Sequence, residues 1–409
     1  MSLNYRMQIC QGMDDIAQAD WNSLVRQAHG GVLHPALRHE YLLAMERSGA
    51  ATAETGWGPL HLAILDSNDT LAAALPLYLK SHSYGEYVFD WAWAQAYQRE
   101  GLPYYPKLLC ALPFTPVPAN KLLHRDAESL AALVAGLNTA CQRWSLSDAD
   151  LGTTVSGAHL LFLNEAEHTA LTLNRDTPGW MQRRVIQFHW RNEHPLEHRP
   201  YRDFEEFLGC LNHKKRKNIR SERRKALEGG LTVQARVGHE LSSTELDFIL
   251  ECYNNTYFEH GSTPYLNRDF FDRLMSSMGE QVLVFLALDD GKPVGCSLFL
   301  FNEERLYGRY WGATRRQPCL HFELCYYQAI EWAIQRGISV FEGGAQGEHK
   351  IWRGLNPVSL SSAHWVADDR FAAAIGHFLK RETQHLQQLE GELGEHLAFK
   401  AAQGDAQPL

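Results

Sequence analysis

The two halves of the chain carry the same order of predicted elements, and this repeat limits the folds available to it. Residues 61–94 and 285–314 each read as three short strands joined by tight turns. The turns DSNDT (66–70) and DDGKP (289–293) have the Asp, Asn and Gly residues typical of hairpins. Two helical stretches precede each trio, and a helix and an apolar strand follow it. This order predicts an α+β protein built as tandem domains, with mixed sheets flanked by helices.

End signals support the predicted helices. The helix after the first trio has Asp126 as its expected N-cap, and the helix after the second trio has Gly337 as its expected C-cap. A polar, proline-bearing stretch separates the two repeats. The predicted division is a first domain at 1–190, a linker at 191–201, and a second domain at 202–409 that contains a basic helix at 212–228 and a C-terminal helix.

Composition narrows the class of protein. With 45% apolar and 21% charged residues, the chain is expected to be a soluble globular protein. Its formal net charge of −9 means that any contact with a polyanion must come from a local basic patch. The 8 cysteines include no C-x-x-C pair, so we expect reduced thiols and no metal site. No signal peptide or apolar membrane span is present, which favours a cytoplasmic protein.

Two long stretches, 76–123 and 321–365, resemble the FemAB-like family of bacterial proteins. The resemblance extends over most of the chain, from about residue 30 to about residue 390. It implies tandem GNAT-like acyltransferase domains, whose usual order of helices and strands is the order predicted above. The better-known relatives transfer amino acids from aminoacyl-tRNA to peptidoglycan precursors.

The chain departs from the pattern of acetyl-CoA enzymes, whose glycine-rich loop holds a pyrophosphate on backbone N–H groups. In the second half, the segment at the position of this loop is 313–323. It has no pair of glycines, and Pro318 lacks a backbone N–H donor. In the first half, 113–123 offers Lys121 as a candidate phosphate contact. No tightly bound cofactor is expected, and the acyl donor, aminoacyl-tRNA or acyl-CoA, stays open.

A glycine-rich, charged turn follows the predicted strand at 338–343. The run EGGAQGEHKIWRGLNP (342–357) combines glycines that permit a sharp turn with several ionisable side chains. The resemblance places Lys350 in the active site, where its charge would hold an anionic group or stabilise an oxyanion. Arg353 is a candidate substrate contact, and the alternative for both is an exposed loop. The candidate general bases are His349, His321, Glu323 and Glu342.

Aromatic and charged residues near the strand ends are further candidate substrate contacts. In the second half, Tyr310 and Trp311 end the third predicted strand. In the first half, Asp90 is predicted within a strand among aromatic residues. Core packing is the alternative for the aromatic members. The first-half candidates are Asp90, Trp91, Trp93 and Lys107.

The run LNHKKRKNIRSERRKALEGG (211–230) is a dense basic segment on a helical pattern that ends at two glycines. It predicts a local surface for phosphates, whether of tRNA, a nucleotide or an anionic lipid. A solvated helix face is the alternative. The candidate phosphate contacts on it are Lys214, Lys217, Arg220 and Arg224.

Together these features predict an N-acyltransferase that acts on an amine, with a cell-envelope precursor as its candidate acceptor. The expected partner is a phosphate-bearing donor or acceptor, with tRNA as one candidate. Two alternatives remain: an acyl-CoA-dependent N-acetyltransferase of small molecules, and a non-catalytic GNAT-fold module that binds an anionic ligand or tRNA. The sequence leaves the oligomeric state open.

Overall fold

The computed structural model describes residues 5–146, 151–172, 179–344, 347–395 and 397–399. The chain divides into two compact units that are interleaved in sequence. Unit 1 comprises 1–185, 265–277 and 359–387, and unit 2 comprises 186–264, 278–358 and 388–409. The predicted linker at 191–201 lies close to the first crossing between units. The predicted boundaries divide the chain into two continuous domains, and that division stays a prediction.

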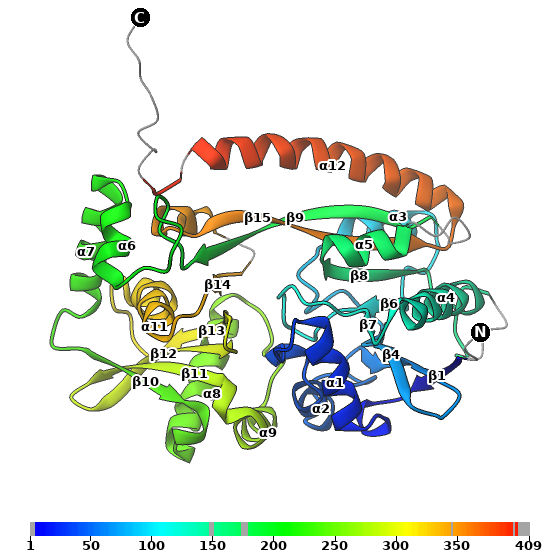
Figure 1. The fold of residues 1–409 in the computed structure, drawn as a ribbon, viewed down its shortest axis with the longest axis horizontal. Coiled ribbons are helices and arrows are strands. Elements are labelled where there is room, and N and C mark those ends of the chain that lie inside the picture. Colours follow the sequence, from blue (N-terminus) through cyan, green and yellow to red (C-terminus); the bar gives the residue numbers. More distant parts are fainter. Residues whose placement is uncertain (1–4, 147–150, 173–178, 345–346, 396, 400–409) are drawn as a thin grey trace, which may run out of the picture. The chain divides into compact units, whose positions relative to one another are not determined.

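Unit 1 contains two sheets, with strand orders β1-β3-β4-β7 and β15-β8-β6-β5-β2 (Figure 1). Helix α4 packs on β3 and β4, and its N-cap is Asp126 as predicted, accepting from the Ser129 N–H at 2.8 Å. The strands are β1 (Arg6–Cys10), β2 (Trp57–Pro59), β3 (His61–Leu65), β4 (Leu71–Leu75), β5 (Tyr78–Lys80), β6 (Lys107–Cys110), β7 (Leu123–His124) and β8 (Gly157–Leu163). The helices are η1 (Met13–Asp15), α1 (Gln18–Ala28), η2 (Pro35–Leu37), α2 (His39–Arg47), α3 (Trp91–Arg99), α4 (Ala127–Trp144), α5 (Glu165–Thr172) and α9 (Arg268–Met278), whose last residue falls in unit 2.

Unit 2 contains the strand order β10-β11-β12-β13-β14-β9, and α8 packs against β13 (Figure 1). Strands β11, β12 and β13 are antiparallel, and β13 pairs in parallel with β14. The strands are β10 (Thr232–Val237), β11 (Val282–Asp289), β12 (Lys292–Phe301), β13 (Arg305–Ala313) and β14 (Val340–Glu342). The helices are α6 (Phe204–Cys210), α7 (His213–Ala226), η3 (Gly238–Glu240), α8 (Ser243–Glu259), η4 (Gly279–Gln281), α10 (Leu320–Phe322), the π-helical turn η5 (Glu323–Tyr327), α11 (Gln328–Arg336) and η6 (Glu348–Arg353).

Besides the last residue of α9, three described elements run from one unit into the other: β9 (Met181–Arg191), β15 (Asn356–Val366) and α12 (Asp369–Glu395), the predicted C-terminal helix. The prediction of an α+β fold with mixed sheets flanked by helices is confirmed. In both units a parallel strand pair follows the antiparallel strands, β6 with β8 in unit 1 and β13 with β14 in unit 2. No helix in the described part of the chain combines the length and the apolarity needed to cross a bilayer.

The predicted third strand of the first trio is wrong. Residues 81–90 form a loop, and helix α3 begins directly after it. Gly85 has φ +81°, and a Cβ there would lie 2.4 Å from the Phe114 ring, so the backbone turns away from an extended path. Asp90 lies at the N-cap position of α3 and not in a strand.

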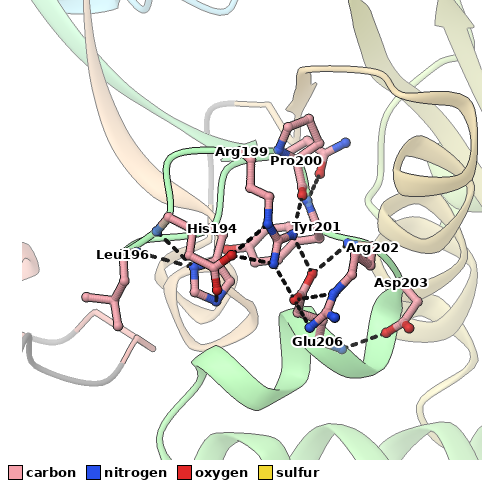
Figure 2. Close-up of polar contacts among 10 residues, drawn as sticks. His194, Leu196, Arg199, Pro200, Tyr201, Arg202, Asp203 and Glu206 are labelled. Carbon is pink, nitrogen blue, oxygen red and sulfur yellow. Dashed lines mark hydrogen bonds and ion pairs between the residues drawn. The ribbon is translucent and has the colours of Figure 1, made fainter.

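Polar contacts fix the segment between β9 and α6. The Glu206 carboxylate accepts from Arg199 at 2.8 and 3.0 Å and from Arg202 at 2.7 Å (Figure 2). These two guanidinium groups hold the pKa of Glu206 well below its usual range. Asp203 caps α6 by accepting from the Glu206 N–H at 2.7 Å. The start of α6, and with it the approach to the basic helix α7, is therefore well defined.

Candidate active site

The glycine-rich turn after β14 is built against β9. Gly343 N–H donates to the Phe188 carbonyl at 2.9 Å, and Phe188 N–H donates to the Gly344 carbonyl at 3.2 Å. A Cβ on Gly343 would lie 2.4 Å from the Leu355 side chain and 3.2 Å from the Phe188 carbonyl oxygen, so the turn packs closely at this glycine. Residues 345–346 of the predicted turn lie outside the described residues. Helix η6 follows and ends at Gly354, which has φ +85°.

Lys350 of η6 is buried, with a relative exposure of 6%. Its Nζ lies 5.9 Å from the centre of the Phe188 ring and has no ion pair or hydrogen bond among the residues that the structure describes. Burial lowers the pKa of Lys350 to about 8. At pH 7 the side chain is therefore a largely protonated cation with unused donors in a desolvated setting.

Two histidines lie in the same region as Lys350. Tyr326 connects them: its ring centre is 5.6 Å from that of His321 and 6.0 Å from that of His349. The Tyr326 hydroxyl lies 3.3 Å from His349 Nε2, and the Trp311 ring is 5.0 Å from the His321 ring. Of this group His321, His349 and Trp311 are partly exposed, so a ligand could reach them from solvent.

Both histidines are neutral at pH 7. Burial, followed by the charges of His349, Arg353 and Lys350, lowers the pKa of His321 to about 4. Burial, followed by the charges of Arg353 and Lys350, also lowers the pKa of His349. A neutral imidazole can accept a proton. The structure thus brings His321 into the region of His349 and Lys350, which are neighbours in the sequence.

Arg353 shapes this region. Its Nε donates to Tyr327 at 2.9 Å, one terminal nitrogen donates to the His349 carbonyl at 2.8 Å, and the other donates to Glu222 at 2.8 Å. Its guanidinium also stacks 3.6 Å from the Phe322 ring centre. The predicted substrate contact is therefore a buried group committed to holding the turn.

The two candidate carboxylic acids differ in setting. Glu323 is fully buried and accepts from the partly exposed Arg223 at 2.9 and 3.1 Å. Glu342 accepts from Arg305 at 2.6 Å, and its second oxygen has no hydrogen-bond partner among the described residues. Burial raises the pKa of Glu342 to about 7 despite the charge of Arg305. Glu342 can therefore exchange a proton near neutral pH, whereas the Glu323 geometry is that of a scaffold.

The end of β13 packs closely against α8. The β12–β13 register shifts between Leu298 and Phe299, opposite Arg309. A Cβ on Gly312 would lie 2.1 Å from the Cys252 carbonyl oxygen, so α8 approaches the strand as closely as glycine allows. Tyr310 packs on Tyr253, with ring centres 5.0 Å apart, and belongs to the opposite face of the strand from Trp311.

Two of the residues predicted in unit 1, Asp90 and Lys107, belong to a second, buried group. Lys107 is fully buried, and its ammonium donates to Asp90, to Glu86 at 2.8 Å and to Ser83 at 2.9 Å. Burial raises the pKa of Glu86 to about 7, whereas Lys107 outweighs burial and holds the pKa of Asp90 well below its usual range. Trp91 is partly exposed. The predicted contacts Asp90 and Lys107 are thus an ion pair with each other.

Histidines extend this group into the sheet of unit 1. Tyr104 donates to Asp90 at 2.6 Å and lies 3.2 Å from His159 Nε2. His159 and His364 are 2.8 Å apart through their Nδ1 atoms, and Trp93 packs on both rings. Burial lowers the pKa of His159 to about 3 and that of His364 well below its ordinary value. These histidines are neutral, buried members of the core.

The basic run forms helix α7, as predicted, with Asn212 as its N-cap. Its four candidate phosphate contacts are all exposed, and one of them, Arg220, pairs with Glu205 on α6 at 2.5 Å. Lys121 instead is buried and donates to two backbone carbonyls, those of Ala119 at 2.8 Å and Phe162 at 3.0 Å. The exposed candidates on α7 are Lys214, Lys217, Arg220 and Arg224.

Sequence reasoning missed several charged members of both groups. Glu222 is the only acidic residue of α7, and Arg305 begins β13, but their partners lie far away in sequence. A usable signal was a charged or imidazole side chain inside an apolar strand, as in AHLLFL around His159. The residues missed are Glu86, His159, Glu222, Arg305 and Tyr326.

The sequence matches the FemAB-like family, described as acting in peptidoglycan biosynthesis/recognition, over residues 12–401. The chain belongs to the FemAB-like family. Membership supports a transferase that acts in peptidoglycan-related synthesis. No curated protein matches the sequence.

Two solved structures share the fold of this FemAB-like protein. FemX is 11% identical, with a TM-score of 0.52 over 88% of this chain and 98% of FemX. A conserved protein of unknown function from Bacteroides thetaiotaomicron VPI-5482 is also 11% identical, with a TM-score of 0.51 over 89% of this chain and all of that protein. At such identities the likeness concerns the fold alone.

Proposed function

We propose that this FemAB-like protein transfers an acyl group to an amine at the site formed by Lys350, His321 and His349. The observation that carries the proposal is the buried Lys350 ammonium, which has no hydrogen-bond partner among the described residues and lies in the same region as two neutral imidazoles. Acyl transfer creates an oxyanion and releases a proton from the attacking nitrogen. This group contains a cation that can stabilise the oxyanion and imidazoles that can accept the proton.

In the proposed reaction the neutral amine attacks the carbonyl carbon of the donor. The Lys350 ammonium donates a hydrogen bond to the oxygen on which negative charge develops, in a setting where burial strengthens the interaction. His349 or His321 takes the proton that the nitrogen loses. The tetrahedral intermediate then collapses, the bond to the leaving oxygen or sulfur breaks, and that atom takes up a proton.

We further propose that the donor is aminoacyl-tRNA and that the acceptor is an amine of a peptidoglycan precursor. The exposed basic face of α7 supports a donor with several phosphates. Acyl-CoA is less well supported because the loop before the short helix α10 lacks the glycines of a pyrophosphate loop. The family description supports the precursor.

The test is a transfer assay read by mass spectrometry. The purified protein is incubated with uridine-linked cell-wall precursors and either a total aminoacyl-tRNA pool or acetyl-CoA. A precursor heavier by one amino-acid residue is the expected product, and acetylation of a small amine would instead support the acyl-CoA alternative. Binding of tRNA or precursor without any product would support a recognition module.

Charge reversal on α7 tests the donor separately. Lys217→Glu/Arg224→Glu is expected to weaken tRNA binding and to reduce the slope of log affinity against log salt by about 2, since two phosphate contacts are lost. Lys292→Glu/Arg336→Glu changes the net charge equally at other exposed positions of unit 2 and serves as the control. Equal affinity in both variants would exclude α7 as the tRNA contact.

A further inference from the structure

Helix α7 presents two kinds of surface. Its outer face carries the exposed Lys217 and Arg224, whereas Glu222 is partly buried. At 100° per residue, Lys217 and Arg224 lie about 140° and 160° around the helix axis from Glu222. Ile219 and Ala226 are the buried residues of the inner face. One helix therefore separates a basic face in solvent from an acidic side chain turned inward.

Glu222 ties this helix to the turn that carries the proposed catalytic residues. Its Oε2 accepts from Arg353 at 2.8 Å and also from the Tyr327 hydroxyl. Arg353 in turn donates to the carbonyl of His349 at 2.8 Å. A second contact between the same elements is Lys215, whose ammonium lies 4.5 Å from the Trp352 ring centre.

The next residue of α7, Arg223, contacts the elements that carry Glu323 and Tyr326. Arg223 pairs with Glu323 of η5 at 2.9 Å and with Glu331 of α11 at 2.8 Å. Glu323 begins the π-helical turn that also contains Tyr326. Such turns are frequent at functional sites. Two consecutive residues of opposite charge thus anchor α7 to η6 and to η5.

These contacts link the position of α7 to the position of η6. Arg353 has a relative exposure of 4%, and Nε and both terminal nitrogens are hydrogen-bonded. A buried guanidinium that loses its carboxylate is strongly unfavourable, so η6 moves with α7 or loses its anchor. Any ligand that immobilises α7 is therefore coupled to the backbone on either side of His349.

We propose that α7 couples anion binding on its outer face to the alignment of the acyl-transfer site, with Glu222 and Arg223 as positioning residues. The inference rests on the proposed function for the role of His349 and Lys350. Its ligand is any extended polyanion, so it does not require the donor to be tRNA. Its consequence is that an occupied basic face holds the catalytic turn in place before the acceptor arrives.

Hydrogen–deuterium exchange with inorganic polyphosphate tests the coupling. In the wild-type protein, polyphosphate is expected to slow exchange at least about fivefold in α7 and in residues 347–355. In Glu222→Gln the slowing is expected to persist in α7 and to disappear from 347–355. Glu222→Asp, which keeps the carboxylate, should restore part of the effect, and Glu228→Gln on the exposed end of the segment should behave as wild type. Equal protection of 347–355 in wild type and Glu222→Gln, or no protection of it in the wild type, would overturn the proposal.

A second readout separates this coupling from a general loss of structure. The Glu222 charge raises the pKa of His349, whereas burial, Arg353 and Lys350 lower it. Glu222→Gln should therefore lower the pKa of His349, measured from its rate of modification by diethylpyrocarbonate against pH. An unfolded site would show the opposite, a return toward the ordinary value. This measurement needs no acyl transfer. A lowered pKa together with the exchange pattern above, but with no transfer activity, would reject the proposed reaction and retain the coupling, whereas an unchanged pKa would show that Glu222 does not act on the turn and would overturn the proposal.

Discussion

Replacing Lys350 by methionine should make the protein more stable at pH 7 while removing its proposed catalytic group. Burial lowers the pKa of this lysine from 10.5 to about 8. Each tenfold change in proton affinity is worth 1.36 kcal/mol, so this pKa difference corresponds to about 3 kcal/mol. The free energy of unfolding is lower by about this amount because the folded state holds the ammonium charged and desolvated. Methionine fills a similar volume without charge, and its repacking should cost less than about 1.5 kcal/mol.

The sign of the pH dependence follows from the same pKa. Below pH 8 the lysine is protonated in both the folded and the unfolded state, so the full penalty is present. Between pH 8 and 10.5 the unfolded state binds more protons than the folded state, so wild-type stability rises with pH because of this group. The methionine variant lacks this contribution, and its advantage should fade across that interval.

Urea unfolding at pH 7, 8, 9 and 10 measures the difference between the two proteins. Lys214→Met, at an exposed position of α7, is the control and should change stability by less than about 0.5 kcal/mol at any pH. The reasoning would be refuted if Lys350→Met were less stable than the wild type at pH 7, or if the difference did not change between pH 8 and 10.

Three further predictions concern packing, an ion pair and catalysis. Gly312→Ala should destabilise the protein by about 1–3 kcal/mol in thermal unfolding, because the added Cβ would lie 2.1 Å from a carbonyl oxygen of α8. The control Gly209→Ala lies in open space and should stabilise the protein by about 0.5 kcal/mol. Glu323→Ala should cost about 3 kcal/mol in urea unfolding, because it removes the buried partner of an arginine; a cost below 1 kcal/mol would contradict this account. A profile of kcat/KM against pH should fall near pH 8 on the alkaline side, because Lys350 loses its proton there. On the acid side it should fall only below the ordinary histidine pKa of 6.5, because the site lowers the pKa of His349.

Local features of the fold were predictable from the sequence because they depend on short-range chemistry. The capping carboxylate of Asp126, the C-cap at Gly337 and the two hairpin turns each lie within a few residues of the elements they define. The basic helix was predictable because its charge and its terminal glycines form one continuous run. The repeated order of elements then led to the fold class.

The error in the first trio occurred where distant contacts determine the local structure. Residues 81–90 are rich in aromatic side chains that favour strands, yet Glu86 and Asp90 are drawn inward by Lys107. The interleaving of the two units also has no local signal, because it depends on where β9, β15 and α12 pack.

The candidate site was predictable only in part. The turn around Lys350 was visible as an unusual combination of glycines and charges. The partners that decide what each charge does were not visible, because Glu222 lies 131 residues from Arg353 and Arg223 lies 100 residues from Glu323. As a result, the sequence suggested Arg353 as a substrate contact and Glu323 as a general base, whereas their geometry is that of supports.

The most direct test of the proposed reaction is a single-turnover measurement with Lys350→Met and Lys350→Arg. Enzyme in excess is mixed with aminoacyl-tRNA bearing a labelled amino acid and with a uridine-linked precursor, and the label transferred to the precursor is followed over time. The proposal predicts that Lys350→Met slows transfer by about 10²–10³-fold, the size typical of losing one oxyanion donor, and that Lys350→Arg retains part of the rate. Wild-type transfer that proceeds at the same rate in Lys350→Met would contradict it.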